Sequence, residues 1–111
     1  MRKRKKCLKH ITAVDEVITM PIKQGNGILR YTVSTNSKGE IARYSLAYIN
    51  PHLCGIDNGR VLGYDNSHGY HHRHYMGKEE KIAFTTYKEI ADCFDNEWRT
   101  LHEKAKKQQK C

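Results

Sequence analysis

Residues 86–105 read Thr-Tyr-Lys-Glu-Ile-Ala-Asp-Cys-Phe-Asp-Asn-Glu-Trp-Arg-Thr-Leu-His-Glu-Lys-Ala, and this stretch decides the fold class. Its apolar residues recur at helical spacing and form one stripe, at Tyr87, Ile90, Ala91, Phe94, Trp98, Leu101 and Ala105. Thr86 followed by Glu89 has the spacing of a capping box, which favours a helix start at this point. The stretch predicts one helix over residues 86–106 with Trp98 largely buried, so another layer must cover the stripe.

The chain before this helix has the pattern of short strands. Alternating or β-branched runs end at turn signals rich in glycine and asparagine. The expected strands span residues 11–20, 28–35, 41–49, 60–65 and 70–76. These runs predict an α+β fold: an antiparallel β-sheet of about five or six strands with a C-terminal helix packed on one face. The opposite face of the sheet would be partly open, which leaves a surface for a functional site.

Length and composition set the remaining limits. A chain of 111 residues with 38% hydrophobic residues predicts a single domain over residues 1–111. A net charge of +8 favours an acidic partner, with nucleic acid first and an acidic protein next. The basic run in residues 1–7 is expected to be a mobile tail that attracts polyanions.

No apolar stretch follows that basic run, so it is not expected to act as a signal peptide, and no window predicts a membrane span. The expected location is cytoplasmic. The cysteines are widely spaced and contain no C-x-x-C pair, which predicts four reduced thiols, at Cys7, Cys54, Cys93 and Cys111.

The candidate site lies in residues 64–74, which read Tyr-Asp-Asn-Ser-His-Gly-Tyr-His-His-Arg-His. If residues 70–76 are extended, His72 and His74 share one face of the strand and Arg73 points to the other. The tight connection over residues 66–69 should bring Asp65 beside His72 or His74. A carboxylate beside an imidazole fixes its tautomer and favours its protonated form.

These residues are sufficient for cleavage of RNA without a metal or cofactor. His72 and His74 would serve as general base and general acid, in an order that the sequence does not assign. Arg73 would hold phosphate, although strand alternation aims it away from both histidines. It would then contact a flanking phosphate or pair with an acid, unless the strand is irregular there. Further candidate nucleic-acid contacts are Tyr64, Asn66, His68, Tyr70, His71 and Lys78.

Two alternatives stay open. The same histidines, with Asp65 or His68 as a third ligand, could hold a metal ion and make the chain a metal-dependent nuclease. A non-catalytic module that binds nucleic acid or an acidic partner is the other alternative. Histidine favours catalysis, because lysine and arginine usually suffice for binding. The sequence also leaves open whether the chain forms a homo-oligomer.

The second half of the chain resembles the TumE family of small bacterial toxin–antitoxin proteins. The resemblance rests on Tyr64-Asp65-Asn66, Gly69 and His72-Arg73-His74, and continues through Gly77, Lys78-Glu79-Glu80 and Phe84-Thr85 to the C-terminal helix. It implies a toxin encoded beside a DNA-binding antitoxin of winged-helix type. Family members are often acidic at the position of His71, and the basic N-terminal tail is not a family feature. Gly69 is expected to serve the turn and Asn66 to serve or cap it.

Overall fold

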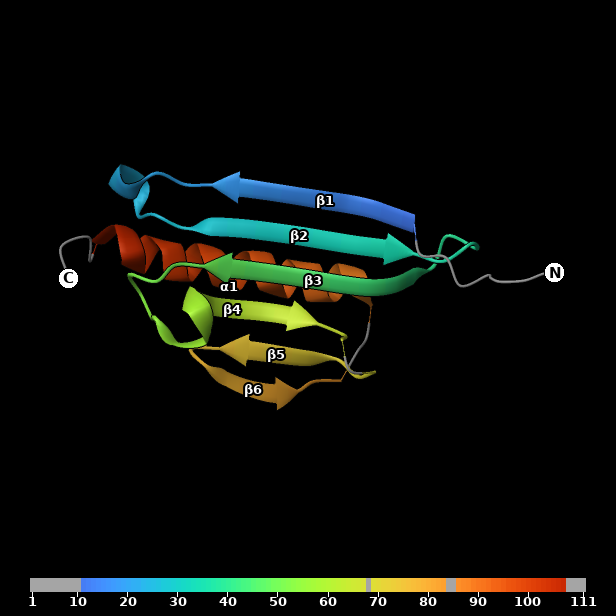
Figure 1. The fold of residues 1–111 in the computed structure, drawn as a ribbon. Helices are drawn as coiled ribbons and strands as arrows, with labels where there is room; N and C mark the ends of the chain where they lie inside the picture. The colour runs from blue at the N-terminus through green and yellow to red at the C-terminus, as the bar shows by residue number, and fades with distance from the viewer. Residues whose placement is uncertain (1–10, 68, 84–85, 108–111) are drawn as a thin grey trace.

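A computed structural model describes residues 11–67, 69–83 and 86–107, which form one sheet and one long helix (Figure 1). The strands are β1 (Ile11–Thr19), β2 (Ile28–Thr35), β3 (Ile41–Ile49), β4 (Arg60–Asp65), β5 (His72–Tyr75) and β6 (Lys78–Lys81). Two short 3-10 turns, η2 (Ile22–Gln24) and η3 (Ile56–Gly59), lie in the connections, and α1 (Tyr87–Lys107) ends the described chain. The basic tail lies outside the described residues, as do Cys7 and Cys111.

The six strands lie in the order β1-β2-β3-β4-β5-β6, and each pairs antiparallel with the next. Helix α1 runs along one face of this sheet and packs against β3 and β4 (Figure 1). The predicted α+β class, antiparallel sheet and covering helix are confirmed. The sixth strand, Lys-Glu-Glu-Lys in β6, is exposed throughout and has no apolar alternation by which the sequence could identify it.

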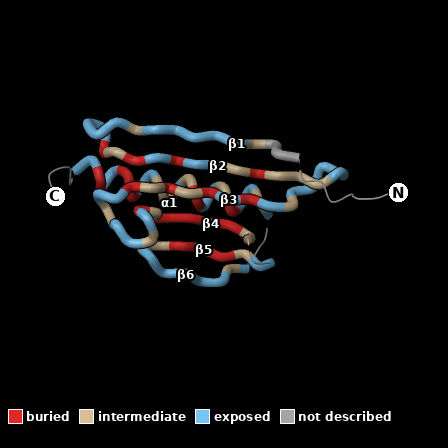
Figure 2. The backbone as a smooth tube through the Cα atoms, viewed as in Figure 1, coloured by how far each residue is buried: buried red, intermediate tan, exposed pale blue. Residues whose placement is uncertain are grey.

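The core lies between α1 and the middle strands (Figure 2). Tyr48 and Phe94 are fully buried, and the Phe94 ring meets Tyr31 edge-on with ring centroids 5.5 Å apart. Trp98 is only partly buried, less than the apolar stripe predicted. Its indole N–H donates to Asp95 Oδ1 at 3.2 Å, which holds the ring beside a polar group near the helix surface.

The local signals that predicted α1 are present in the structure. Thr86 Oγ1 accepts a hydrogen bond from the Glu89 amide at 3.1 Å, so Thr86 caps the first turn. Asp57 and Asn58 both have φ of 57°, the left-handed conformation that an Asp-Asn-Gly sequence favours. That turn belongs to the longer connection between β3 and β4 rather than to a two-residue hairpin.

Strand β1 forms one edge of the sheet. It pairs with β2, and no second strand lies against it among the described residues. Helix α1 lies over the middle strands and leaves β1 uncovered (Figure 1). The Val17 and Ile18 side chains on this edge are 55% and 45% exposed. Within the described ranges, the open edge therefore combines exposed apolar side chains with a backbone that no second strand pairs.

The helix α1 is not apolar enough over any long stretch to span a membrane, and it is the one long helix in the described part of the chain. Cys54 and Cys93 are free thiols, as predicted.

Candidate active site

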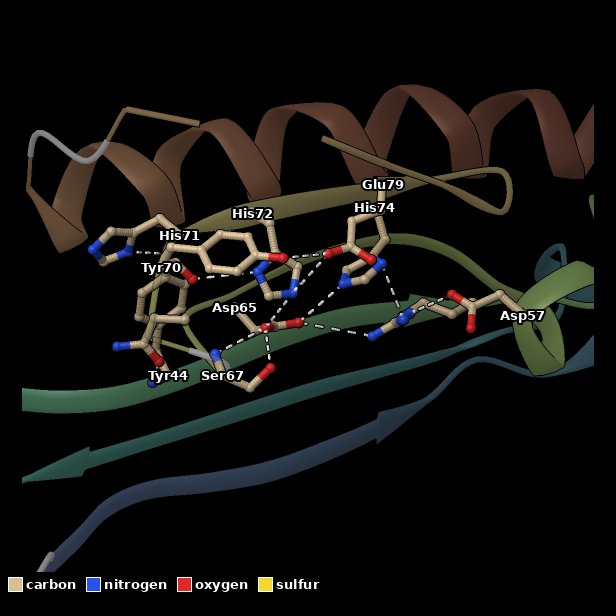
Figure 3. Close-up of polar contacts among 11 residues, drawn as sticks. Tyr44, Asp57, Asp65, Ser67, Tyr70, His71, His72, His74 and Glu79 are labelled. Carbon is tan, nitrogen blue, oxygen red and sulfur yellow. Dashed lines mark hydrogen bonds and ion pairs between the residues drawn. The ribbon is translucent and has the colours of Figure 1, made fainter. Parts of the chain in front are cut away.

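The Asp65 carboxylate lies between two imidazoles on β5. Asp65 ends β4 and is the register partner of His72, while Gly63 faces His74. Asp65 Oδ1 lies 2.8 Å from His72 Nε2, and Asp65 Oδ2 lies 3.2 Å from His74 Nε2 (Figure 3). The expected proximity of Asp65 to both histidines is therefore present. The three side chains project from the sheet face opposite α1, because Tyr64 and Arg73, which alternate with them along the strands, bond to the helix.

Ser67 fixes the carboxylate from its other side. Its backbone N–H and its hydroxyl donate to Asp65 Oδ1 at 3.1 and 2.8 Å (Figure 3). Burial raises the pKa of Asp65, but the hydrogen bonds from Ser67 and the positive charges that the two imidazoles carry at acid pH outweigh this and lower it below its usual value. The site therefore contains an ionised carboxylate at neutral pH.

Arg60 determines the tautomer of His74. Its Nη2 lies 3.1 Å from His74 Nδ1, and because arginine can only donate, Nδ1 must accept. The proton of the neutral ring is then on Nε2, which donates to Asp65. Protonation of Nδ1 as well would place its N–H against the N–H of the Arg60 guanidinium, and two donors repel each other. Burial lowers the pKa of His74, and the charge of Arg60 lowers it further. His74 is thus the neutral ring of the pair.

His72 is placed differently. Its Nε2 faces the Asp65 carboxylate, and its Nδ1 lies 3.3 Å from the carbonyl oxygen of Tyr70. Both of these partners are acceptors, so a doubly protonated His72 can donate from each nitrogen. Glu79 adds a second carboxylate, 3.7 Å from Nε2. The two rings share the Asp65 carboxylate, but their Nδ1 atoms differ in partner: an acceptor faces Nδ1 of His72, and a donor faces Nδ1 of His74.

Both rings are shielded from solvent. His72 is 1% exposed and His74 is 9% exposed. The Tyr70 ring lies beside His72, with centroids 5.0 Å apart, and its hydroxyl donates to Glu79 at 3.3 Å (Figure 3). Tyr70 and Glu79 thus bridge the connection before β5 to strand β6.

Sequence reasoning missed Arg60. Strict alternation from Leu62 and Tyr64 would place Arg60 on the helix face. In the structure Tyr48 pairs with Leu62 and Ile49 pairs with Arg60, so β4 carries one extra residue at this point. Such a bulge re-aims a side chain. No signal in the sequence of β4 marks the bulge.

Arg73 was the predicted phosphate-holding cation, and the structure places it on the helix-covered face instead. Its Nη2 donates to Glu97 Oε2 at 2.8 Å and its Nη1 donates to Glu80 at 3.0 Å. Neighbouring residues on a regular strand point to opposite faces, so Arg73 cannot face the histidines that flank it. The alternative in which Arg73 pairs with an acid is confirmed.

The other predicted nucleic-acid contacts are dispersed. Tyr64 is buried on the helix face, where its hydroxyl donates to Glu97 at 2.5 Å. The His71 Nδ1 lies 2.9 Å from the Tyr44 hydroxyl. Lys78 is exposed on β6. Tyr70 alone among them lies against the histidine pair, and His68 lies outside the described residues.

Two residues of the turn have structural roles. Asn66 Oδ1 accepts from the Tyr44 amide at 3.0 Å and its Nδ2 donates to the Ala42 carbonyl at 3.1 Å, so it ties the end of β4 to β3 rather than capping the turn itself. Gly69 has φ of +81°, as expected for a glycine that serves the turn.

Comparison with known proteins places the chain in a family. A family model described as "Toxin TumE" matches residues 10–104. The chain belongs to the TumE toxin family. The match extends well beyond the half of the chain that carries the resemblance in sequence. No curated protein and no solved structure shows a significant match.

The TumE match supports a toxin role, and a toxin of this kind implies a cognate antitoxin. The residues that carried the TumE resemblance now separate into two groups. Asp65, His72 and His74 form the cluster on the open face, whereas Tyr64 and Arg73 join the sheet to α1. The TumE motif therefore contains both a candidate site and a structural link.

The candidate site of this TumE chain also has the composition of a metal centre. Donor atoms of Asp65, His72 and His74 all lie within 4.8 Å of one another. A metal on Nε2 of His74 would require the ring proton on Nδ1, and this proton would face the Arg60 guanidinium at 3.1 Å. The residues therefore fit a metal at His72 and Asp65 better than at His74.

Proposed function

We propose that this toxin is a small ribonuclease that cleaves RNA without a metal ion, with Asp65, His72 and His74 as its catalytic residues. The observation that carries the proposal is the asymmetry of the two imidazoles. They share one carboxylate, but a carbonyl oxygen faces the second nitrogen of His72 and a guanidinium faces that of His74. An acid–base pair requires this difference, since one ring must begin with a proton to give and the other must be able to take one.

The roles follow from the neighbours of each ring. His74, the neutral ring, takes the proton of the ribose 2′-hydroxyl as its oxygen forms a bond to phosphorus. His72, the ring that can donate from both nitrogens, gives a proton to the 5′-oxygen as its bond to phosphorus breaks. The products are a 2′,3′-cyclic phosphate and a 5′-hydroxyl. His74 has gained one proton and His72 has lost one. Asp65 holds both rings in position between these steps.

Partners of this toxin follow from its chemistry and its family. RNA is the substrate, and the net charge of +8 supports long-range attraction to it. A DNA-binding antitoxin of winged-helix type would restrain the toxin. An RNA target places its action in the cytoplasm.

The proposal is tested by expressing the chain with His72→Ala and with His74→Ala while following growth and RNA integrity together. Each substitution should reduce cleavage by about 100- to 10,000-fold, the usual contribution of a general acid or base. His52→Ala is the matched control, because His52 is exposed and remote in sequence from the cluster. Full growth arrest and RNA loss in a variant that combines His72→Ala with His74→Ala would refute the catalytic assignment.

A metal-dependent nuclease is the second candidate, favoured by the compact set of donor atoms in Asp65, His72 and His74. Chelation distinguishes the two mechanisms. Activity of the purified toxin should persist in excess chelator if no metal is required. Loss of activity with chelator and its return with a divalent ion would replace the proposed mechanism with the metal-dependent one.

A further inference from the structure

The guanidinium of Arg60 occupies the position that a phosphate-binding group would need. It reaches solvent, with a side chain 28% exposed, whereas the imidazoles beside it are buried. It also touches the cluster directly, through His74 Nδ1 at 3.1 Å. Among the described residues, no other arginine or lysine contacts Asp65 or His74.

The backbone and a glycine hold Arg60 in this place. The extra residue in β4 turns its side chain to the histidine face. Gly63 gives it room, because a Cβ at that position would lie 3.0 Å from Arg60 Cδ. Asp57 fixes it from the far side by accepting from Nε at 2.7 Å. The side chain is therefore positioned before any ligand arrives.

The guanidinium keeps donors for a ligand. Its hydrogen bonds in the described part of the chain run from Nε to Asp57 and from Nη2 to His74. Its Nη1 lies 3.9 Å from Asp65 Oδ2, which is an ion pair but too long for a hydrogen bond. A guanidinium has five N–H donors and binds phosphate through two of them at once.

We propose that Arg60 binds the phosphate of the substrate and, in doing so, uncovers Nδ1 of His74. In the ligand-free chain the Arg60 N–H occupies the lone pair that a general base needs. A phosphate that draws the guanidinium toward itself leaves that lone pair available to the ribose hydroxyl. Arg60 thereby couples substrate binding to activation of the base. This inference rests on the proposed ribonuclease function, but phosphate binding can be measured without it.

The experiment titrates the full chain with inorganic phosphate and follows the imidazole nitrogens by NMR. Phosphate should shift Nδ1 of His74 toward the value of an unbonded lone pair. In Arg60→Gln the Nδ1 signal of His74 should show the chemical shift of an unbonded lone pair even without phosphate. The phosphate affinity of this variant should fall about tenfold or more. Arg99→Gln is the matched control, since it removes one positive charge from an exposed position on α1.

A second variant protects the test against loss of fold in Arg60→Gln. Gly63→Ala keeps the arginine but places a Cβ 3.0 Å from its Cδ, so the side chain must shift slightly and phosphate affinity should fall while the charge is unchanged. An oligoribonucleotide with 2′-O-methyl groups, which cannot be cleaved, should compete with inorganic phosphate if the site accepts the phosphates of RNA. Binding of inorganic phosphate that this oligonucleotide does not reverse would overturn the assignment to substrate.

The outcomes separate this inference from the ribonuclease proposal. RNA cleavage by Arg60→Gln at the wild-type rate would overturn the role of Arg60 and leave the ribonuclease intact. Phosphate-dependent shifts at His74 without RNA cleavage would support the phosphate site and refute the ribonuclease. Wild-type protein in which phosphate leaves the His74 signals unchanged would overturn the inference directly.

Discussion

At the scale of single residues, the protonation states of Asp65, His72 and His74 depend on the side chains and carbonyl groups that contact them. In the folded chain the pKa of His74 lies below its ordinary value of 6.5 because of burial and then of Arg60. As the pH falls through 6.5, His74 is therefore protonated in the unfolded chain before it is protonated in the folded chain, and this lowers the stability of the fold. The lowered pKa of Asp65 adds a second loss of stability in the same direction, below its ordinary value of 3.8.

We therefore expect the free energy of unfolding to decrease as the pH is lowered from 7.5 to 5, with the first part of the loss due to His74. Urea denaturation at a series of pH values measures this slope. His74→Gln should flatten it, and His52→Gln, which alters an exposed ring, should leave it as in the wild type. An equal slope in wild type and His74→Gln would contradict the assignment of a neutral His74.

Shielding of the histidines gives a prediction at the same scale. Tyr70 lies against His72 and bonds to Glu79, so Tyr70→Ala should open the site. Diethyl pyrocarbonate should then modify His72 faster than in the wild type, as read by mass spectrometry of the peptides. Modification of the exposed His52 is the internal control and should proceed at the same rate in both proteins. Unchanged reactivity of His72 would mean that Tyr70 does not limit access.

The proximity of Asp65, His72 and His74 could be predicted from the sequence for a physical reason. Residues 65 and 72 flank a tight glycine turn, so a hairpin brings them together whatever the rest of the fold does. His74 follows on the same face by strand alternation. Arg60 could not be predicted in the same way, because the bulge that re-aims it depends on how β4 pairs with β3. The position of Tyr70 beside His72 likewise involves Glu79, and the contact between Tyr70 and Glu79 forms only in three dimensions.

At the scale of elements, Glu97 links α1 to the sheet. Its carboxylate accepts from Tyr64 at 2.5 Å on β4 and from Arg73 at 2.8 Å on β5. Burial and this carboxylate raise the pKa of Tyr64 well above its usual range, so the phenol keeps its proton and acts as donor. Two strands are thus joined to the helix through one side chain.

Arg73→Gln should therefore lower stability rather than remove a phosphate contact. Loss of a hydrogen bond to a charged group costs about 1.5–3 kcal/mol. The free energy of unfolding, from urea denaturation, checks the magnitude, and Lys88→Gln is a control because its ion pair with Asp92 lies on the exposed surface of α1. An Arg73→Gln protein as stable as the wild type would show that the link contributes little.

The elements themselves were predictable where their signals are local. The apolar stripe and the Thr86 cap predicted α1, and alternation predicted β2 and β3, because these patterns reflect which residues face the core. Strand β4 was predicted as a short run after a turn, and its residues from Val61 to Asp65 are all buried. The strand expected over residues 70–76 is shorter, His72–Tyr75, since Tyr70 leaves the strand to cover His72. Strand β6 pairs through its backbone while its side chains remain exposed, so hydrophobic pattern could not identify it.

At the scale of the whole molecule, the sheet is covered unevenly. Its open edge, β1, has no second strand beside it in the described part of the chain, and it exposes Val17 and Ile18. Exposed edge strands pair readily with other chains, and a charged side chain on the edge suppresses this. Val17→Lys should therefore raise the yield of dispersed protein when the toxin is expressed alone, as measured by the fraction that remains after centrifugation. Lys23→Gln, near the same edge, should not raise it.

From that open edge we expect a limit on how much active toxin a cell can accumulate. Encounters between two copies increase with the square of their concentration, whereas encounters with RNA, the proposed substrate, increase only in proportion to it. Slow expression should therefore give the most damage per molecule, and a sudden excess should be lost to self-association. An antitoxin that occupied the edge would act as a chaperone as well as an inhibitor, so its removal would start both the toxic activity and the decay of the toxin.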